Sequence, residues 1–75
     1  MNDGFKLWDV VIEVDSTFGH KFVVIEVLDG SYIFQDMKNP GSREGYSKEF
    51  AWHLFVKVGR WDCKAGREIE DAEED

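Results

Sequence analysis

The sequence predicts a mainly β protein: a small barrel of four to five antiparallel strands, with one short helical turn before the last strand and an acidic C-terminal tail. Residues 22–28 form an apolar run rich in β-branched side chains and interrupted only by Glu26, which is typical of a strand. Asp29-Gly30 follows at once and is a strong hairpin signal, because type I′ turns need positive φ at both central residues. The 75 residues include one cysteine, Cys63, so no intrachain disulfide can form, and the aromatic side chains (Phe 6, Tyr 2, Trp 3) must supply much of the core.

The first strand is expected over residues 5–14. Every second residue from Trp8 to Val14 is apolar, whereas Phe5 and Leu7 fall in the opposite phase. This change of phase predicts either a bulge between Leu7 and Trp8 or a strand that begins only at Leu7.

The second half of the chain predicts two short strands around a helical turn. Asn39-Pro40-Gly41 is turn chemistry, and a strand is expected next, over residues 43–46. Ser47 is a suitable N-cap for a helical turn that ends near His53. Residues 55–58 alternate as the last strand, which Gly59 is expected to end. The predicted domain is therefore residues 1–60, and residues 61–75 are predicted to be an acidic, flexible tail.

Charge and composition argue against several classes of partner. Nine Lys and Arg stand against sixteen Asp and Glu, which gives a net charge of −7, and six of the last eight residues are acids. Without a basic stripe, neither direct nucleic-acid binding nor binding to acidic lipid is expected. The N-terminal residues lack the pattern of a signal peptide, and no apolar run is long enough to span a membrane. One unpaired cysteine is typical of a cytoplasmic protein.

No pattern in the chain predicts catalysis, a metal site or a cofactor. His20, His53 and Cys63 have no metal-binding spacing, and two surface histidines with a thiol in the tail is the simpler interpretation. Asp15, Asp29 and Asp36 stand where turns or strand ends favour aspartate in any case. We therefore expect a protein that is not an enzyme.

The order of these elements resembles a family of small SH3-like barrel proteins, many of them encoded by phages and prophages. The resemblance rests on Phe18-Gly19-His20, on the hairpin, and on Ser47 and Phe50 of the helical turn leading to Phe55 and Val58. It implies an SH3-like fold and a phage origin, but no reaction. Peptide-binding SH3 domains carry a tryptophan at a strand start, whereas Trp52 falls on the helical turn, so binding to proline-rich peptides does not carry over.

The expected function is therefore binding to another protein, in particular as a phage-encoded modulator or inhibitor of a host protein that itself binds nucleic acid. Exposed aromatic side chains anchor such contacts, and an acidic tail steers them towards a basic surface. The alternatives are a self-associating assembly module and a Tudor-like aromatic cage for a methylated side chain. In the plainest interpretation, the aromatics cover the ends of the barrel and the tail only improves solubility. The residues expected to bind the partner are Trp8, Tyr46, Trp52, Trp61, Glu68, Glu70, Asp71, Glu73, Glu74 and Asp75.

Overall fold

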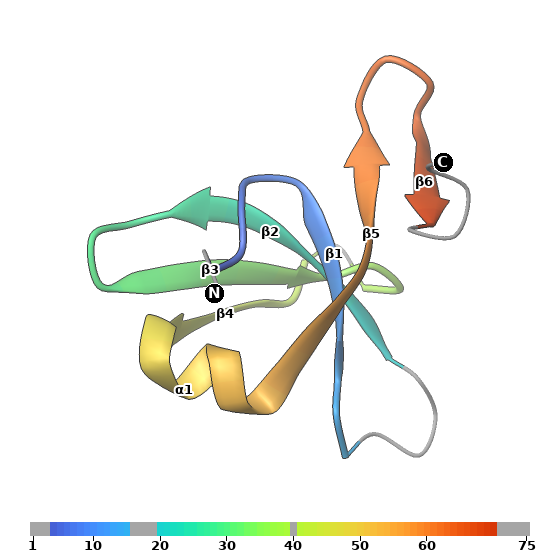
Figure 1. Cartoon of the computed structure of the whole chain (residues 1–75). Helices are drawn as coiled ribbons and strands as arrows, with labels where there is room; N and C mark the ends of the chain where they lie inside the picture. The colour runs from blue at the N-terminus through green and yellow to red at the C-terminus, as the bar shows by residue number, and fades with distance from the viewer. Residues whose placement is uncertain (1–3, 16–19, 40, 71–75) are drawn as a thin grey trace.

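The computed structural model describes residues 4–15, 20–39 and 41–70, which form one antiparallel sheet and one helix (Figure 1). The mainly β prediction is confirmed. The elements in chain order are β1 (Asp9–Glu13), β2 (Lys21–Val27), β3 (Ser31–Asp36), β4 (Arg43–Ser47), α1 (Lys48–Leu54), β5 (Phe55–Asp62) and β6 (Arg67–Glu70). Within the described residues, no helix is long and apolar enough to cross a membrane.

The strand order across the sheet is β4-β3-β2-β1-β5-β6. The first four strands therefore form a meander, and β5 returns to pair with β1 before β6 folds back beside it. Figure 1 shows α1 at one end of the long β5 strand and the β5–β6 hairpin at its other end. In the described part of the chain, no ladder joins the edge strands β4 and β6, so the sheet is not closed into a barrel.

The described residues form six strands because residues 61–62 and 67–70 belong to the sheet and not to a tail. The predicted boundary at residue 60 falls inside β5, and β6 pairs with β5 from Gly59↔Glu70 to Asp62↔Arg67. Gly59, expected to end the last strand, is buried in its middle, where a Cβ would lie 2.5 Å from the carbonyl oxygen of Ile69. The glycine therefore permits a close approach of β6. The remaining tail residues, 71–75, lie outside the described residues, as do residues 16–19 of the first loop.

The central hairpin is confirmed, with a turn different from the one expected. Leu28 N–H donates to the carbonyl oxygen of Ser31 at 2.9 Å, so Asp29 and Gly30 are the two turn residues. Neither of them has positive φ, so the turn is not type I′. The register between β2 and β3 shifts between Val24 and Glu26, which is a bulge that adds local twist.

Helix α1 begins as predicted. The Ser47 hydroxyl oxygen accepts a hydrogen bond from the Phe50 backbone N–H at 3.2 Å, and Glu49 lies in the first turn at the positive end of the helix dipole. The helix ends at Leu54, one residue beyond the predicted end. It places Ala51 against the sheet, where this side chain is fully buried.

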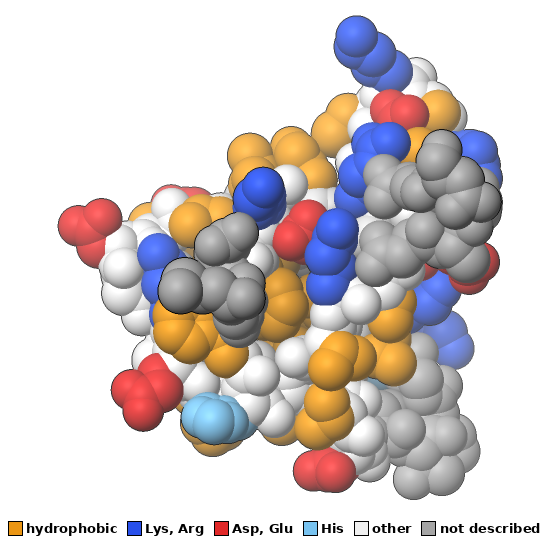
Figure 2. Space-filling view, viewed as in Figure 1, with side chains coloured by type: hydrophobic (Ala, Val, Ile, Leu, Met, Phe, Trp, Pro, Cys, Tyr) orange, Lys and Arg blue, Asp and Glu red, His pale blue; other side chains and the backbone are white. Residues whose placement is uncertain are grey.

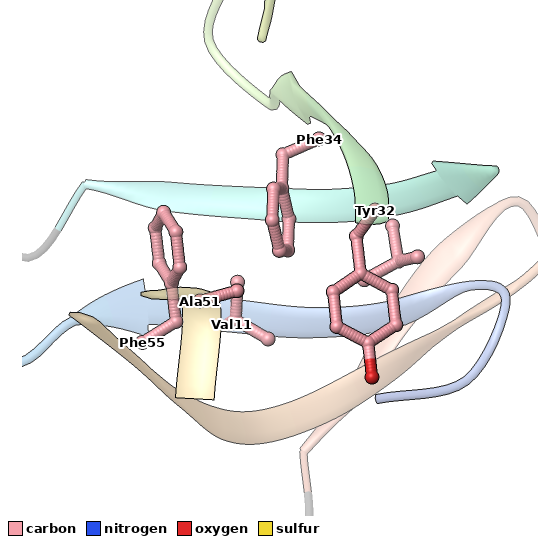
Figure 3. Packing of buried hydrophobic residues seen from close by; sticks show 6 residues of the cluster. Val11, Tyr32, Phe34, Ala51 and Phe55 are labelled. Atoms are coloured by element: carbon pink, nitrogen blue, oxygen red, sulfur yellow. The ribbon is translucent and has the colours of Figure 1, made fainter. Parts of the chain in front are cut away.

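The core lies between α1 and one face of the sheet, which we call the inner face (Figure 3). Phe34 and Phe55 are in ring contact at its centre, with centroids 4.5 Å apart. Tyr32 is only 2% exposed, and its buried hydroxyl accepts hydrogen bonds from Trp52 Nε1–H and from the Phe5 backbone N–H. Phe50 lies outside this core and is 52% exposed. The buried cluster consists of Val11, Val24, Tyr32, Phe34, Ala51 and Phe55.

Candidate functional site

The opposite face of the sheet, which we call the outer face, carries a second set of apolar side chains. Strand register places five residues in one row across it, because each is the direct partner of the next: Arg43, Gln35, Val23, Val10 and Gly59. Val10 and Val23 are buried, although neither belongs to the core cluster. Side chains on this face therefore cover them.

Trp8 and Trp61 come together beside this row. Trp8 lies two residues before Val10, and Trp61 lies two residues after Gly59, the cross-strand partner of Val10. The Trp8 backbone holds the two strands on either side: its N–H donates to the carbonyl oxygen of Val24 at 2.8 Å, and its carbonyl oxygen accepts from Trp61 N–H at 2.7 Å. Two tryptophans far apart in the sequence are thus fixed in one neighbourhood.

Trp8 has an unusual backbone conformation. Its φ is 72°, and among the described residues no other non-glycine has positive φ. A turn holds it there, in which Asp9 N–H donates to the Lys6 carbonyl oxygen at 3.0 Å and the Asp9 carboxylate accepts from Lys6 N–H at 2.7 Å. This left-handed conformation costs a non-glycine residue about 1–2 kcal/mol. The turn also explains the change of sequence phase at Leu7 and Trp8, since β1 begins only at Asp9.

Trp8 and Trp61 help to line a cleft of about 510 Å³, which we call the outer-face cleft. This volume is within the range typical of ligand pockets. Most of the lining is apolar, and Gln35 and Arg43 add polar groups. Figure 2 shows hydrophobic side chains near the base of the β5–β6 hairpin with Lys and Arg side chains around them. The lining residues are Trp8, Val23, Ile25, Gln35, Met37, Arg43 and Trp61.

An ion pair between Lys21 of β2 and Glu68 of β6 holds β6 over the outer face. Lys21 Nζ lies 3.0 and 3.1 Å from the two carboxylate oxygens of Glu68, although β1 and β5 lie between their strands in the sheet. Glu70 is 4.0 Å from the same ammonium group. The sheet must curl for these contacts to form. Both glutamates, predicted to face a partner, are therefore in ion pairs within the chain.

The predicted partner-binding residues do not form one surface. Trp8 and Trp61 line the outer-face cleft, whereas Tyr46 packs on the inner face against Phe34 and Phe55. Trp52 lies on α1, 41% exposed, and donates its indole N–H to the Tyr32 hydroxyl. Asp71, Glu73, Glu74 and Asp75 lie outside the described residues.

Tyr46 also has an altered acidity. Its hydroxyl donates to Glu44 Oε1 at 2.6 Å, and this hydrogen bond, together with partial burial and the negative charge nearby, raises the pKa of Tyr46 to about 12. The phenol therefore stays protonated over the physiological pH range and acts as a structural donor.

Sequence reasoning missed five lining residues: Val23, Ile25, Gln35, Met37 and Arg43. The available signal was the alternation in β2, where Phe22 and Val24 point to one face and Val23 and Ile25 to the other. The alternation alone does not say which face the core covers, so both sets were equally good core candidates.

No metal-binding cluster of three or more His, Cys, Asp or Glu residues occurs in the described part of the chain. His20 Nδ1 lies 3.8 Å from Asp36, and Asp36 also accepts a hydrogen bond from Lys38 N–H. Cys63 lies exposed in the turn between β5 and β6, where Asp62 caps the backbone N–H groups of Lys64 and Ala65.

Comparisons with family models, with curated proteins and with solved structures found no match to this chain.

Proposed function

We propose that the chain is a non-catalytic protein-binding module that holds a segment of its partner in the outer-face cleft. The single observation that carries this proposal is the juxtaposition of Trp8 and Trp61 over an apolar floor. Tryptophan is among the residues most enriched at the energetic centres of protein interfaces. The strained φ of Trp8 supports the same assignment, since strain of this kind clusters at functional sites.

The strand order supports an SH3-like arrangement for this module. Short strands with a helical turn before the last predicted strand are the features that predicted an SH3-like barrel. The observed meander, helix α1 and strand β5 paired with β1 are compatible with such an arrangement. In this proposal the long β5–β6 hairpin is an elaboration that curls over the outer face and forms one wall of the cleft.

The chemistry of the lining favours an apolar side chain next to a carboxylate. The two indole rings, Ile25 and Met37 offer apolar contact, and the Arg43 guanidinium offers paired donors that match a carboxylate. A methylated lysine fits less well, because the cation in the lining would repel it and the described lining contains no acid.

The net charge supports a more specific proposal about the partner. A chain of charge −7 is attracted from a distance to a basic surface, such as that of a nucleic-acid-binding protein. A phage-encoded modulator that occludes such a host protein in the cytoplasm would use this attraction for the approach and the cleft for the contact.

Tryptophan fluorescence tests the cleft. In a Trp52→Phe background only Trp8 and Trp61 emit, and the probes are two acetylated hexapeptides that differ only in whether Glu or Lys follows a central Phe. We expect the Glu peptide to shift the emission and to bind at least about tenfold more tightly than the Lys peptide, a difference of about 1.4 kcal/mol.

Arg43→Gln should remove this preference, whereas Arg67→Gln on β6 is the matched control and should keep it. Equal binding of both peptides by the Trp52→Phe protein would refute the role of Arg43. No change in emission with either peptide at millimolar concentration would refute the cleft as the binding site.

A further inference from the structure

Strand β4 presents an open edge whose hydrogen-bonding groups can be assigned from register. Among the described residues, β4 pairs with β3 alone. Lys48 N–H donates to the Gly30 carbonyl oxygen and Asp36 N–H donates to the Ser42 carbonyl oxygen, each at 3.0 Å, and both pairs fall in the register of Tyr32↔Tyr46.

Hydrogen-bonded pairs alternate along an antiparallel ladder. The even-numbered residues of β4 therefore direct their backbone groups towards β3, and Arg43, Gly45 and Ser47 direct theirs away from it. The Ser47 carbonyl is an exception, because an N-cap carbonyl accepts the first hydrogen bond of its helix. The free edge thus offers both backbone groups of Arg43 and Gly45, and the N–H of Ser47.

An exposed aromatic shelf accompanies this edge. Phe50 is 52% exposed and stacks on Tyr46 of β4, with centroids 5.6 Å apart and an interplanar angle of 23°. An exposed, unpaired strand next to exposed apolar surface is a template for strand addition. The other edge strand, β6, has no such shelf, since its one apolar side chain, Ile69, is partly buried.

We infer that β4 pairs antiparallel with β4 of a second copy of this chain, about a two-fold axis at Gly45. In that register Gly45 faces Gly45 and exchanges two hydrogen bonds, and Ser47 N–H of each copy donates to the Arg43 carbonyl of the other. Glu44 faces Tyr46, so no like charges are directly opposite each other. Glycine on the axis leaves room for the two backbones, and the Phe50 rings of both copies lie beside the junction.

This dimer shares Arg43 with the outer-face cleft, since the Arg43 backbone serves the strand edge and its side chain lines the cleft, but it involves neither Trp8 nor Trp61. Four backbone hydrogen bonds and a small apolar contact make a weak, reversible dimer. Each copy carries a charge of −7, so added salt should screen the repulsion and favour association.

Sedimentation of the full chain from about 10 μM to about 1 mM tests the inference over a range suited to a small interface. We expect the average mass to rise from 8.7 kDa towards twice that value, and to rise further with added salt. Gly45→Pro removes the N–H at the axis and should leave a monomer, while β3 pairing survives because that N–H points away from β3. Gly45→Ala keeps the N–H and should still associate, and Phe50→Ser should weaken the dimer about tenfold. Circular dichroism confirms that each variant is folded.

Amide hydrogen exchange gives a readout specific to this register. The amides of Gly45 and Ser47 should exchange more slowly at high protein concentration, whereas Arg43 N–H should not change, because the carbonyl opposite it is used by α1. A strict monomer at every concentration would overturn the inference. So would association that Gly45→Pro leaves intact, since that would assign the interface to another surface.

Discussion

Gly59→Ala is the sharpest test of how the outer-face cleft is built. A Cβ at this position would lie 2.5 Å from the Ile69 carbonyl oxygen and 3.1 Å from the Glu70 Cα. Both atoms belong to the backbone of β6, which cannot rotate away as a side chain can. The strand must therefore move outward, and the contact of Glu68 with Lys21 would be lost with it.

The expected cost is about 3 kcal/mol, the upper end of the range for overpacking, because the obstacle is backbone. A domain of this size has only about 3–5 kcal/mol of net stability from its core, so this substitution should remove most of it. Urea denaturation measures the loss in free energy of unfolding, and tryptophan emission reports whether Trp8 and Trp61 become more exposed.

Two other glycines separate the clash from the general effect of adding a methyl group. A Cβ at Gly30 would meet no heavy atom within 4 Å apart from those of its chain neighbours, so Gly30→Ala should change stability by less than about 0.5 kcal/mol. Gly66 has open space but a φ of 68°, so Gly66→Ala should cost about 1 kcal/mol from backbone strain alone. If Gly59→Ala lowers the free energy of unfolding by no more than Gly66→Ala does, the close approach of β6 to Gly59 does not fix the position of the β5–β6 hairpin.

Three further predictions concern the inner face. Phe34→Ala removes a buried ring at the centre of the core and should cost about 3–5 kcal/mol in thermal or urea unfolding, so a loss below about 1 kcal/mol would contradict the assigned core. Ser47→Ala removes the N-cap of α1 and should cost about 1 kcal/mol, whereas Ser47→Asp, which keeps an acceptor, should be close to neutral. Tyr46 should ionise near pH 12 in an ultraviolet titration of the folded protein, and Glu44→Gln should lower the pKa of Tyr46 towards the ordinary 10.0. Because the pKa of Tyr46 is higher in the folded than in the unfolded protein, the stability that its hydrogen bond contributes is complete below pH 10. This contribution is lost as the pH rises through about 12.

Local chemistry in the sequence determined much of the backbone. The apolar run of β2, the Asp29-Gly30 turn and the N-cap at Ser47 each depend on neighbours within a few residues, and the structure confirms all three. Such signals are reliable because turn and cap preferences arise from the residues that adopt them. The change of phase at Leu7 and Trp8 predicted a bulge there or a strand starting at Leu7, which is wrong: these residues form a turn, and β1 begins only at Asp9.

Only the tertiary structure decided how residues 59–70 fold and what the outer face holds. A glycine after an alternating run is typical both of a strand end and of a site of close backbone approach, and Gly59 proved to be the second, because β6 returns beside it. The meeting of Trp8 and Trp61 likewise depends on β5 pairing with β1 across most of the chain. Alternation divides a strand into two faces but does not say which face receives a helix, so the core beneath α1 and the cleft opposite it were fixed only by long-range packing.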